Sequence, residues 1–425
     1  PQASDMTTFW ANLKAGKDCI TEVPKSRWDL AELSNIKSQS GKSMSQWGGF
    51  IDDVDCFDPL FFRISPREAE LLDPQERLFL QVCWEAMEDA GYTPTNLVEA
   101  EGENKQRPVG VFVGVMHKDY TLLQNEAVYE GLRLPLSLNY APIANRVSYF
   151  CNFHGPSMAI DTVCSSSLTA VHYAMESLIK GESKVAFAGG VNLSLHPNKY
   201  QTYGLAGMHS SDGRCRAFGE GGDGYVSAEG IGSIVLKPLQ QALTDGDGVY
   251  AVLKGSSINH VGAASGITVP SPVAQGEMIA RNFKKTGIDP ETISYIEAHG
   301  TGTSLGDPIE IQGLNRAFDK FTEEKQFCAL GSVKSNMGHA ESAAGISGLT
   351  KTILQLHHKT LVKSLHAEVV NPLLDLAASP FYLQTQTQAW TLSPEAKTKV
   401  RRAGVSSFGA TGSNAHVIVE EYVEG

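Results

Sequence analysis

The stretch SMAIDTVCSSSL, residues 157–168, decides the fold of this chain. Its first half is short, mostly apolar and β-prone, whereas the apolar residues that follow are spaced three and four apart, as on one face of a helix. Those residues are Leu168, Val171, Met175 and Leu178. The sequence therefore predicts a strand that turns sharply into a helix, with Cys164 at the turn.

A cysteine at such a turn faces the free amides of the helix and the positive end of its dipole. Free cysteine titrates near pH ~8.5, and a helix N-terminus lowers that pKa. We therefore expect Cys164 to be a nucleophile with a stabilised thiolate. The alternative is that Cys164 is a small buried hydrophobe, as most intracellular cysteines are.

Composition predicts a soluble α/β protein. The chain has 425 residues, is 42% hydrophobic and lacks an apolar run near the ~18 residues that a membrane helix needs. Its 41 glycines are spread along the sequence, which is typical of many tight strand-to-helix turns. The seven cysteines are widely spaced without a CxxC pair, which favours a reducing cytoplasm over a disulfide framework or a zinc site.

The net charge of −12 disfavours nucleic acid as a partner. An acidic partner would need a local basic patch, and the densest candidate is Lys397, Lys399, Arg401 and Arg402. A solvated strand edge is an equally good interpretation of that patch. The chain begins at Pro1 without a methionine or signal peptide, so we expect it to be excised from something longer.

Strand-like and helix-like segments alternate from residue 109 onward, which predicts a sheet with helices on its faces. The same plan recurs later in the chain, so we expect two similar halves, about residues 1–240 and 241–425, stacked around a site between them. The expected strands are residues 109–115, 158–163, 185–191, 249–253, 327–333, 381–384, 402–408 and 416–419. The expected helices are residues 9–13, 74–90, the segment from 168, and 342–356.

Three glycine-rich turns of the second half carry residues that could act with Cys164. Residues 294–303 end a strand in His299, and residues 332–341 place Lys334 and His339 before a helix. Residues 404–412 put the ring of Phe408 among residues with almost no side chain. A histidine on its own is more often structural, but two of them converging on a cysteine could donate to a thioester oxygen. The remaining histidines are interpreted as packing or solvent-facing: His117, His154, His172, His196, His209, His260, His357, His358, His366 and His416.

The motifs DTVCSSS (161–167), EAHGTGT (297–303) and KSNMGH (334–339) together resemble the β-ketoacyl synthase, or condensing, domain of modular polyketide synthases, in the thiolase-like superfamily. The resemblance covers essentially the whole chain and implies a five-layered αβαβα fold, a homodimer and a Cys164–His299–His339 active site. Further stretches resemble ketosynthases of bacterial assembly lines whose acyltransferase is a separate protein. They are residues 73–77, 194–200, 221–226 and 339–345.

The resemblance implies an acyltransferase. Cys164 would take the growing acyl chain from the phosphopantetheine thioester of a carrier protein, and a second carrier would bring a malonyl group. His299 and His339 would hold the malonyl thioester oxygen and stabilise the enolate that remains when carbon dioxide leaves. The carbanion would then attack the Cys164 thioester and lengthen the chain by two carbons. No metal and no bound cofactor is required.

The resemblance also implies supporting roles. The backbone amides of Cys164 and Phe408 would form an oxyanion hole, and Phe408 would be the gate between acyl chain and extender unit. Lys334 would support the electrostatics of the pocket, although a structural salt bridge is as good an interpretation. Asn336 is expected to support the site from the same motif.

Substrate contacts are implied at other positions. Thr301 and Thr303 match positions that hydrogen-bond pantetheine. Met208 lies in an unusual stretch near the acyl pocket and would narrow or redirect it, with a neutral packing change as the alternative. The family also begins with an apolar strand that would precede Pro1, so we expect part of the folded domain to lie outside this sequence.

The implied partners are acyl carrier proteins, neighbouring domains of the same synthase and a second copy of the chain, in the cytoplasm, without nucleic acid or membrane. A thiolase is disfavoured because it needs a second cysteine late in the chain, and none follows Cys328. A non-elongating domain that only binds and passes on the acyl chain is the remaining alternative. Such domains commonly lose the histidine that His299 represents, and decarboxylating loading domains replace the cysteine by glutamine.

Overall fold

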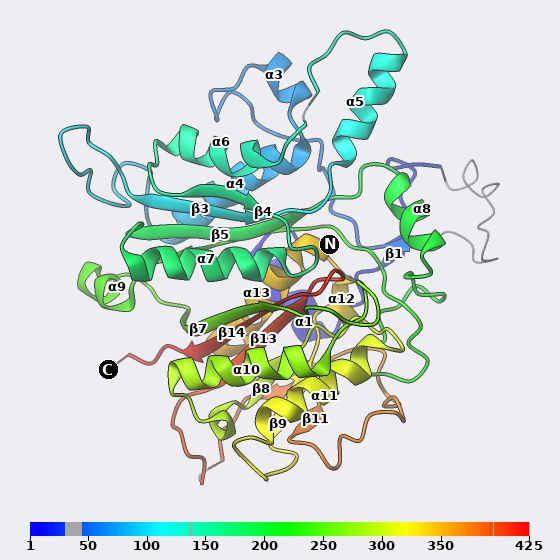
Figure 1. The fold of residues 1–425 in the computed structure, drawn as a ribbon. Helices are drawn as coiled ribbons and strands as arrows, with labels where there is room; N and C mark the ends of the chain where they lie inside the picture. The colour runs from blue at the N-terminus through cyan, green and yellow to red at the C-terminus, as the bar shows by residue number, and fades with distance from the viewer. Residues whose placement is uncertain (30–44, 137, 394, 425) are drawn as a thin grey trace.

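A computed structural model describes residues 1–29, 45–136, 138–393 and 395–424. Two sheets are separated by a layer of helices, and further helices cover the outer face of each sheet (Figure 1). The order of layers is therefore αβαβα, as the sequence analysis expected. None of the helices within the described ranges combines the length and the apolar character that crossing a membrane would require.

The first sheet has the strand order β4-β3-β5-β6. Its strands are β3 (Val109–Gly114), β4 (Ser157–Ile160), β5 (Val185–Asn192) and β6 (Gly230–Leu236). The first three run parallel, and β6 pairs antiparallel with β5. Every residue of β3 and β5 is buried, because helices cover both faces of these strands.

The second sheet has the order β11-β9-β8-β13-β14-β7. The strands from β11 to β13 run parallel, whereas β14 is antiparallel to both of its neighbours. The strands are β7 (Ala251–His260), β8 (Tyr295–Glu297), β9 (Cys328–Gly331), β11 (Phe381–Leu383), β13 (Arg402–Phe408) and β14 (Ser413–Glu421).

Two helices fill the layer between the sheets, α7 (Ser166–Lys180) and α13 (Ala344–His357). Outside, α4 (Pro74–Asp89) and α6 (Ala141–Cys151) cover the first sheet, and α10 (Pro272–Thr286) packs with α11 (Gly306–Phe318) on the second. The other helices are α1 (Met6–Ala15), α3 (Pro66–Leu71), α5 (Asp119–Tyr129), α8 (Asn198–Leu205), α9 (Leu239–Asp245) and α12 (Lys334–Met337). Short strands also occur at β1 (Thr21–Glu22), β2 (Trp47–Gly48), β10 (Thr360–Leu361) and β12 (Gln388–Ala389).

The predicted strand-to-helix turn around Cys164 is confirmed, since β4 ends at Ile160 and α7 begins at Ser166. The sequence analysis missed β6, α10 and α11. It also ended β7 too early, because that strand continues as far as His260 through polar residues. Those residues are held by their long antiparallel pairing with β14, which local hydrophobicity does not show.

Small residues let the central helix α7 approach the first sheet closely. A Cβ added to Gly114 of β3 would lie 2.4 Å from the backbone nitrogen of Ser167, at the start of α7. A Cβ at Gly345 of α13 would lie 2.6 Å from Cγ of Leu168. Neither position has room for a side chain, so these glycines fix the distance at which α7, and with it Cys164, sits between the sheets.

We predict that Gly114→Ala lowers the free energy of unfolding by at least about 1–3 kcal/mol, because backbone atoms of α7 would have to move. Urea unfolding measures the change. The matched control is Gly232→Ala in β6 of the same sheet, where the nearest atom is a side-chain carbon of Ile346 at 3.3 Å. Equal stability of the two variants would contradict the close approach.

Candidate active site

The turn that carries Cys164 is held in a strained conformation. Val163 has φ +58°, in the left-handed region that a β-branched residue rarely adopts. Its N–H donates to Asp161 Oδ1 at 3.0 Å, and its carbonyl accepts the N–H of Ser166 at 3.1 Å. These bonds hold the sharp bend that places Cys164 just before the first turn of α7.

Cys164 is also fixed from the other half of the chain. The hydroxyl of Ser407, on β13, donates to the Cys164 carbonyl at 2.7 Å. The backbone N–H groups of Ala410 and of Cys164 itself face the thiol. Ala410 lies in the turn between β13 and β14. The oxyanion hole expected from the backbone amides of Cys164 and Phe408 stays a prediction.

The expected lowering of the Cys164 pKa is not found. Only 8% of Cys164 is exposed, and its burial raises the pKa of the thiol to about 12. The negative charge of Glu341 acts in the same direction. The two backbone amides and the cation of Lys334 oppose this shift without cancelling it. Cys164 is therefore a neutral thiol at rest, because desolvation outweighs the N-terminal amides.

The two predicted histidines lie side by side. His299 directly follows the β8 strand end, His339 follows α12, and their ring centroids are 5.3 Å apart at an angle of 85°. Glu310 positions the first of them, because its carboxylate accepts the backbone N–H of His299 at 2.7 Å and that of Gly300 at 2.8 Å. The ring of Phe408 packs against His299 at 5.7 Å.

Both histidines are neutral. Burial lowers the pKa of His339 to about 3 and that of His299 well below its usual range, and the charge of Lys334 acts in the same direction on both. His339 Nδ1 accepts the backbone N–H of Glu341 at 3.0 Å. The proton of the neutral ring is therefore on Nε2, which leaves an N–H free to donate.

Lys334 is the common neighbour of the three predicted catalytic residues, since its charge acts on the pKa of each. Burial lowers its own pKa, and Glu297 and Glu310 oppose that shift. No ion pair of Lys334 occurs in the described part of the chain, which favours the electrostatic interpretation over a structural salt bridge. The side chain of Asn336 donates to Lys17 O at 3.2 Å, and its expected support of the site stays a prediction.

The two threonines shape the turn after His299. Their Oγ1 atoms lie 3.2 Å apart, and Thr303 Oγ1 accepts the N–H of Gly306 where α11 begins. Thr301 is buried, with 8% of its surface exposed. A pantetheine contact by Thr301 or Thr303 stays a prediction. The same holds for Met208, which is half-buried and exchanges backbone hydrogen bonds with Tyr203 and Tyr225.

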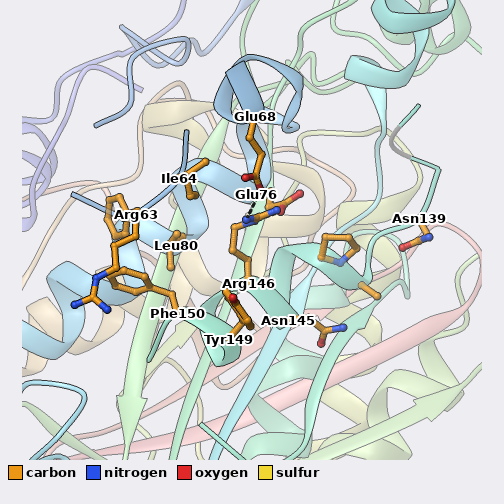
Figure 2. Close-up of a pocket in the computed structure, with 13 residues that line it drawn as sticks. Arg63, Ile64, Glu68, Glu76, Leu80, Asn139, Asn145, Arg146, Tyr149 and Phe150 are labelled. Carbon is orange, nitrogen blue, oxygen red and sulfur yellow. Dashed lines mark hydrogen bonds and ion pairs between the residues drawn. The ribbon is translucent and has the colours of Figure 1, made fainter. Parts of the chain in front are cut away.

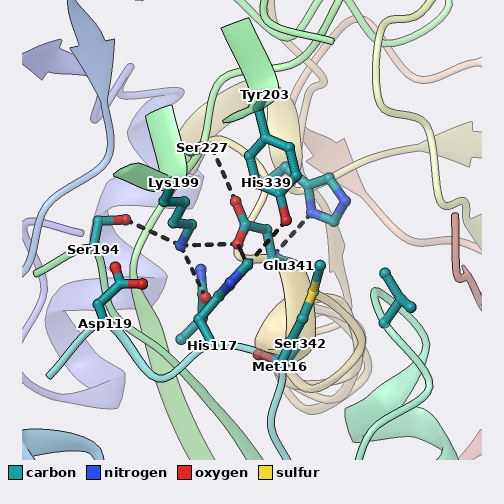
Figure 3. Close-up of polar contacts among 12 residues, drawn as sticks. Met116, His117, Asp119, Ser194, Lys199, Tyr203, Ser227, His339, Glu341 and Ser342 are labelled. Carbon is teal, nitrogen blue, oxygen red and sulfur yellow. Dashed lines mark hydrogen bonds and ion pairs between the residues drawn. The ribbon is translucent and has the colours of Figure 1, made fainter. Parts of the chain in front are cut away.

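The sequence analysis missed a buried charge network behind His339 (Figure 3). Glu341 Oε2 lies 2.8 Å from Lys199 Nζ and 2.8 Å from His117 Nε2, while Oε1 accepts the Ser227 hydroxyl at 2.9 Å. His117 had been interpreted as packing or solvent-facing. Its contacts come from segments far apart in the sequence, so spacing gave no sign of them, although Glu341 follows His339 closely enough to have been noticed.

A surface hollow of about 730 Å³ lies elsewhere, between α4 and α6 (Figure 2). Arg146 crosses it and pairs with Glu68 at 3.0 Å and with Glu76. Neither Cys164 nor either histidine is among its lining residues, so the hollow is separate from the candidate site.

The basic patch near the C-terminus is neutralised by neighbouring carboxylates. Lys397 pairs with Asp289 and Glu291, and Arg401 and Arg402 pair with two glutamates at the end of β14. The strand-edge interpretation of this patch is therefore the better one, and the patch gives no support to docking of an acidic partner there.

We predict that alkylation of Cys164 by iodoacetamide accelerates roughly tenfold per pH unit between about pH 7 and pH 9, because the thiolate fraction still rises far below a high pKa. Peptide mass spectrometry after timed labelling measures the rate at Cys164, and Cys164→Ala assigns the signal. A plateau near neutral pH would show a lowered pKa instead.

Glu341→Gln should lower the free energy of unfolding by about 3–5 kcal/mol, because the buried Lys199 cation would lose its counter-charge. Burial alone would raise the pKa of Glu341, but Lys199 and His117 outweigh it and hold that pKa well below its usual range. The stabilisation is thus present at neutral pH and fades as the pH falls below the usual range for a glutamate.

Chemical denaturation at neutral pH tests this prediction, with Glu126→Gln as the matched control. Glu126 pairs with His196 at 3.0 Å, but 60% of its side chain is exposed, so that variant should lose less than about 1 kcal/mol. Comparable losses in the two variants would contradict a special role for the buried network.

Comparison with known proteins agrees with this geometry. Residues 1–242 match the family model of the β-ketoacyl synthase N-terminal domain, and residues 250–368 match that of the C-terminal domain. The chain is 66% identical to polyketide synthases PksM and PksL of Bacillus subtilis (strain 168) and 52% identical to polyketide synthase ThaG of Burkholderia thailandensis. The three matches cover 99–100% of this chain. The chain in turn spans only 10%, 9% and 7% of the lengths of PksM, PksL and ThaG, respectively.

Solved structures give the same result. The oxazolomycin ketosynthase domain OzmH KS7 of Streptomyces albus JA3453 superposes with a TM-score of 0.95 at 50% identity, over 100% of this chain and 73% of that one. The ketosynthase from module 6 of the bacillaene synthase of Bacillus subtilis 168 gives 0.89 at 42% identity, over 100% and 70%. The fold is thus the thiolase-like αβαβα fold of ketosynthases, and the chain belongs to the β-ketoacyl synthase family as a ketosynthase domain of the polyketide synthase type.

Proposed function

We propose that this ketosynthase domain elongates a polyketide chain by decarboxylative condensation with a malonyl extender. The observation that carries the proposal is the pair of neutral histidines, His299 and His339, whose rings lie side by side. The cation of Lys334 acts on both histidines and also on the Cys164 thiol. Neutral N–H donors aimed at one oxygen are what an enolate requires, because they stabilise developing negative charge without first being charged themselves.

In the first half-reaction, the sulfur of Cys164 attacks the thioester carbonyl of an acyl group carried by an acyl carrier protein. The thiol proton has to leave, and a neutral imidazole is available to accept it. The oxyanion hole expected from the backbone amides of Cys164 and Phe408 holds the resulting oxyanion. The tetrahedral adduct then expels the pantetheine thiolate, which recovers a proton, and the acyl chain remains on Cys164.

In the second half-reaction, malonyl thioester enters and loses carbon dioxide. The electron pair of the broken C–C bond moves into the thioester carbonyl, and Nε2–H of His339 together with the His299 ring holds the enolate oxygen. The enolate carbon attacks the acyl-Cys164 carbonyl, and collapse of that adduct releases the Cys164 thiolate. The product is a β-ketoacyl chain that is two carbons longer and remains on the extender's carrier protein.

The partners in this proposal are acyl carrier proteins, neighbouring domains and a second copy of the chain. The chain would be one domain of a larger cytoplasmic synthase of the type whose acyltransferase is a separate protein, and both substrates would arrive on phosphopantetheine. A homodimer is supported by β4, which is an edge strand of the first sheet. Met158 on β4 is 39% exposed and Tyr149 on the neighbouring helix α6 is 85% exposed, which marks an apolar edge for pairing.

The alternative is a domain that accepts the acyl chain and passes it on without extension. Two variants separate the half-reactions. Cys164→Ala should abolish acylation by an acyl thioester, because the nucleophile is gone. His299→Ala should leave acylation largely intact and lower elongation by a factor of about 100 or more, because one donor to the enolate is lost.

Intact-protein mass spectrometry after mixing with an acyl thioester measures acylation, and addition of malonyl-loaded carrier protein tests for the longer β-keto product. Acylation of the unaltered chain followed by extension supports the condensing enzyme. Acylation without extension by that chain would favour the transacylating alternative. A His299→Ala variant that extends at the normal rate would contradict the assigned role of the histidine pair.

A further inference from the structure

A row of rings continues from the histidine pair into the first half of the chain. The ring of Tyr225 lies 4.9 Å from that of His339, Tyr203 lies 6.1 Å from Tyr225, and His117 lies 5.9 Å from Tyr203. Figure 3 shows Tyr203, His339 and His117 arranged around Glu341. The row thus forms one wall that begins at the catalytic histidines and leads away from them.

Both tyrosines of this wall remain protonated. Burial raises the pKa of Tyr203 and that of Tyr225 well above the usual range. The negative charges of Glu341 and of a Cys164 thiolate act in the same direction on both phenols, which places both near the nucleophile. Each is therefore an O–H donor at any working pH.

The Tyr203 proton is free. His117 Nε2 lies 2.8 Å from the Glu341 carboxylate and 3.0 Å from Tyr203 Oη. A carboxylate can only accept hydrogen bonds, so Nε2 must carry the proton that faces it and cannot accept the Tyr203 hydroxyl. Tyr203 Oη is then the acceptor in its contact with His117, and its own O–H has no partner among the described residues.

The Tyr225 hydroxyl is free as well. It makes no hydrogen bond in the described part of the chain, although the phenol is packed between His339, Tyr203 and His209. Tyr203 and Tyr225 are only partly buried. Two donors without an acceptor among the described residues therefore lie along the wall that starts at His339, close enough to Cys164 for its charge to act on both phenols. An acyl chain attached to the sulfur would pass near them.

An apolar chain on Cys164 would remove water from these hydroxyls without replacing its hydrogen bonds, which is unfavourable for each of them. A site that offers donors to a substrate oxygen discriminates against the analogue that lacks the oxygen. The charged groups behind the wall do not supply acceptors, because Glu341 is held by Lys199, His117 and Ser227.

Building on the proposed ketosynthase function, we propose that the hydroxyls of Tyr203 and Tyr225 select acyl chains that carry an oxygen, as a hydroxyl or carbonyl group, on the carbons that follow the thioester. Each phenol donates a hydrogen bond to that oxygen. Saturated chains of the same length are accepted more slowly.

The test compares acylation of Cys164 by the N-acetylcysteamine thioesters of butyrate and of 3-hydroxybutyrate, followed by intact-protein mass spectrometry. The unaltered chain should react about tenfold faster with the 3-hydroxybutyryl thioester, because one or two additional hydrogen bonds are worth about that factor. Tyr203→Phe and Tyr225→Phe should each slow the reaction of the 3-hydroxybutyryl thioester several-fold more than that of the butyryl thioester. Tyr173→Phe, a change on an exposed tyrosine of α7, is the matched control and should keep the preference.

Thermal melting first identifies which variants are folded, and either tyrosine variant alone suffices for the test. Equal rates with both thioesters in the unaltered chain would overturn the proposal. The proposal would also be overturned if the tyrosine variants slowed acylation by both thioesters by the same factor, or if they affected only the malonyl step. Selective acylation without an extended product would overturn elongation and leave the selection standing, whereas no acylation by either thioester would overturn both.

Discussion

Exclusion of water is the constraint on which the active site depends. Cys164, His299, His339 and Lys334 all lie where burial dominates their protonation, and in each case it favours the uncharged form. A neutral thiol beside neutral imidazoles is inert until a substrate arrives, yet the imidazoles can both accept a proton and donate one. Charging either histidine would cost much more here than in water, which keeps the donors available over a wide range of pH.

The fold produces this arrangement by joining its two halves at the nucleophile. Cys164 comes from the first sheet, but the hydroxyl that holds its carbonyl and one of the amides at its sulfur come from β13 and the turn after it. The strained φ of Val163 persists because those contacts, together with the packing of α7 between the sheets, over-determine the bend. The site therefore exists only when both sheets are in place.

How much of this could be read from the sequence follows from the range of the interactions. Most of the strands, the turn at Cys164 and the histidine pair were predictable, because periodicity and motifs are local. The pKa of Cys164 was predicted in the wrong direction, since helix amides are visible in a sequence and desolvation is not. The backbone N–H of Ala410 beside the thiol was missed because any residue could supply it, so no residue type marks the position.

The charge network behind His339 could not be predicted from the sequence for a related reason. Its role in holding His339 is separate from that of the neighbouring phenols. His117, Lys199 and Glu341 come from three separate segments, and together they hold His339 from behind through the amide of Glu341. The carboxylate of Glu341 is in contact with Lys199, His117 and Ser227, so its oxygens are engaged within the protein. Among the described residues, the phenols of Tyr203 and Tyr225 find no acceptor for their protons. A network that fixes His339 would thereby also leave the neighbouring hydroxyls free for the proposed recognition of an acyl chain on Cys164.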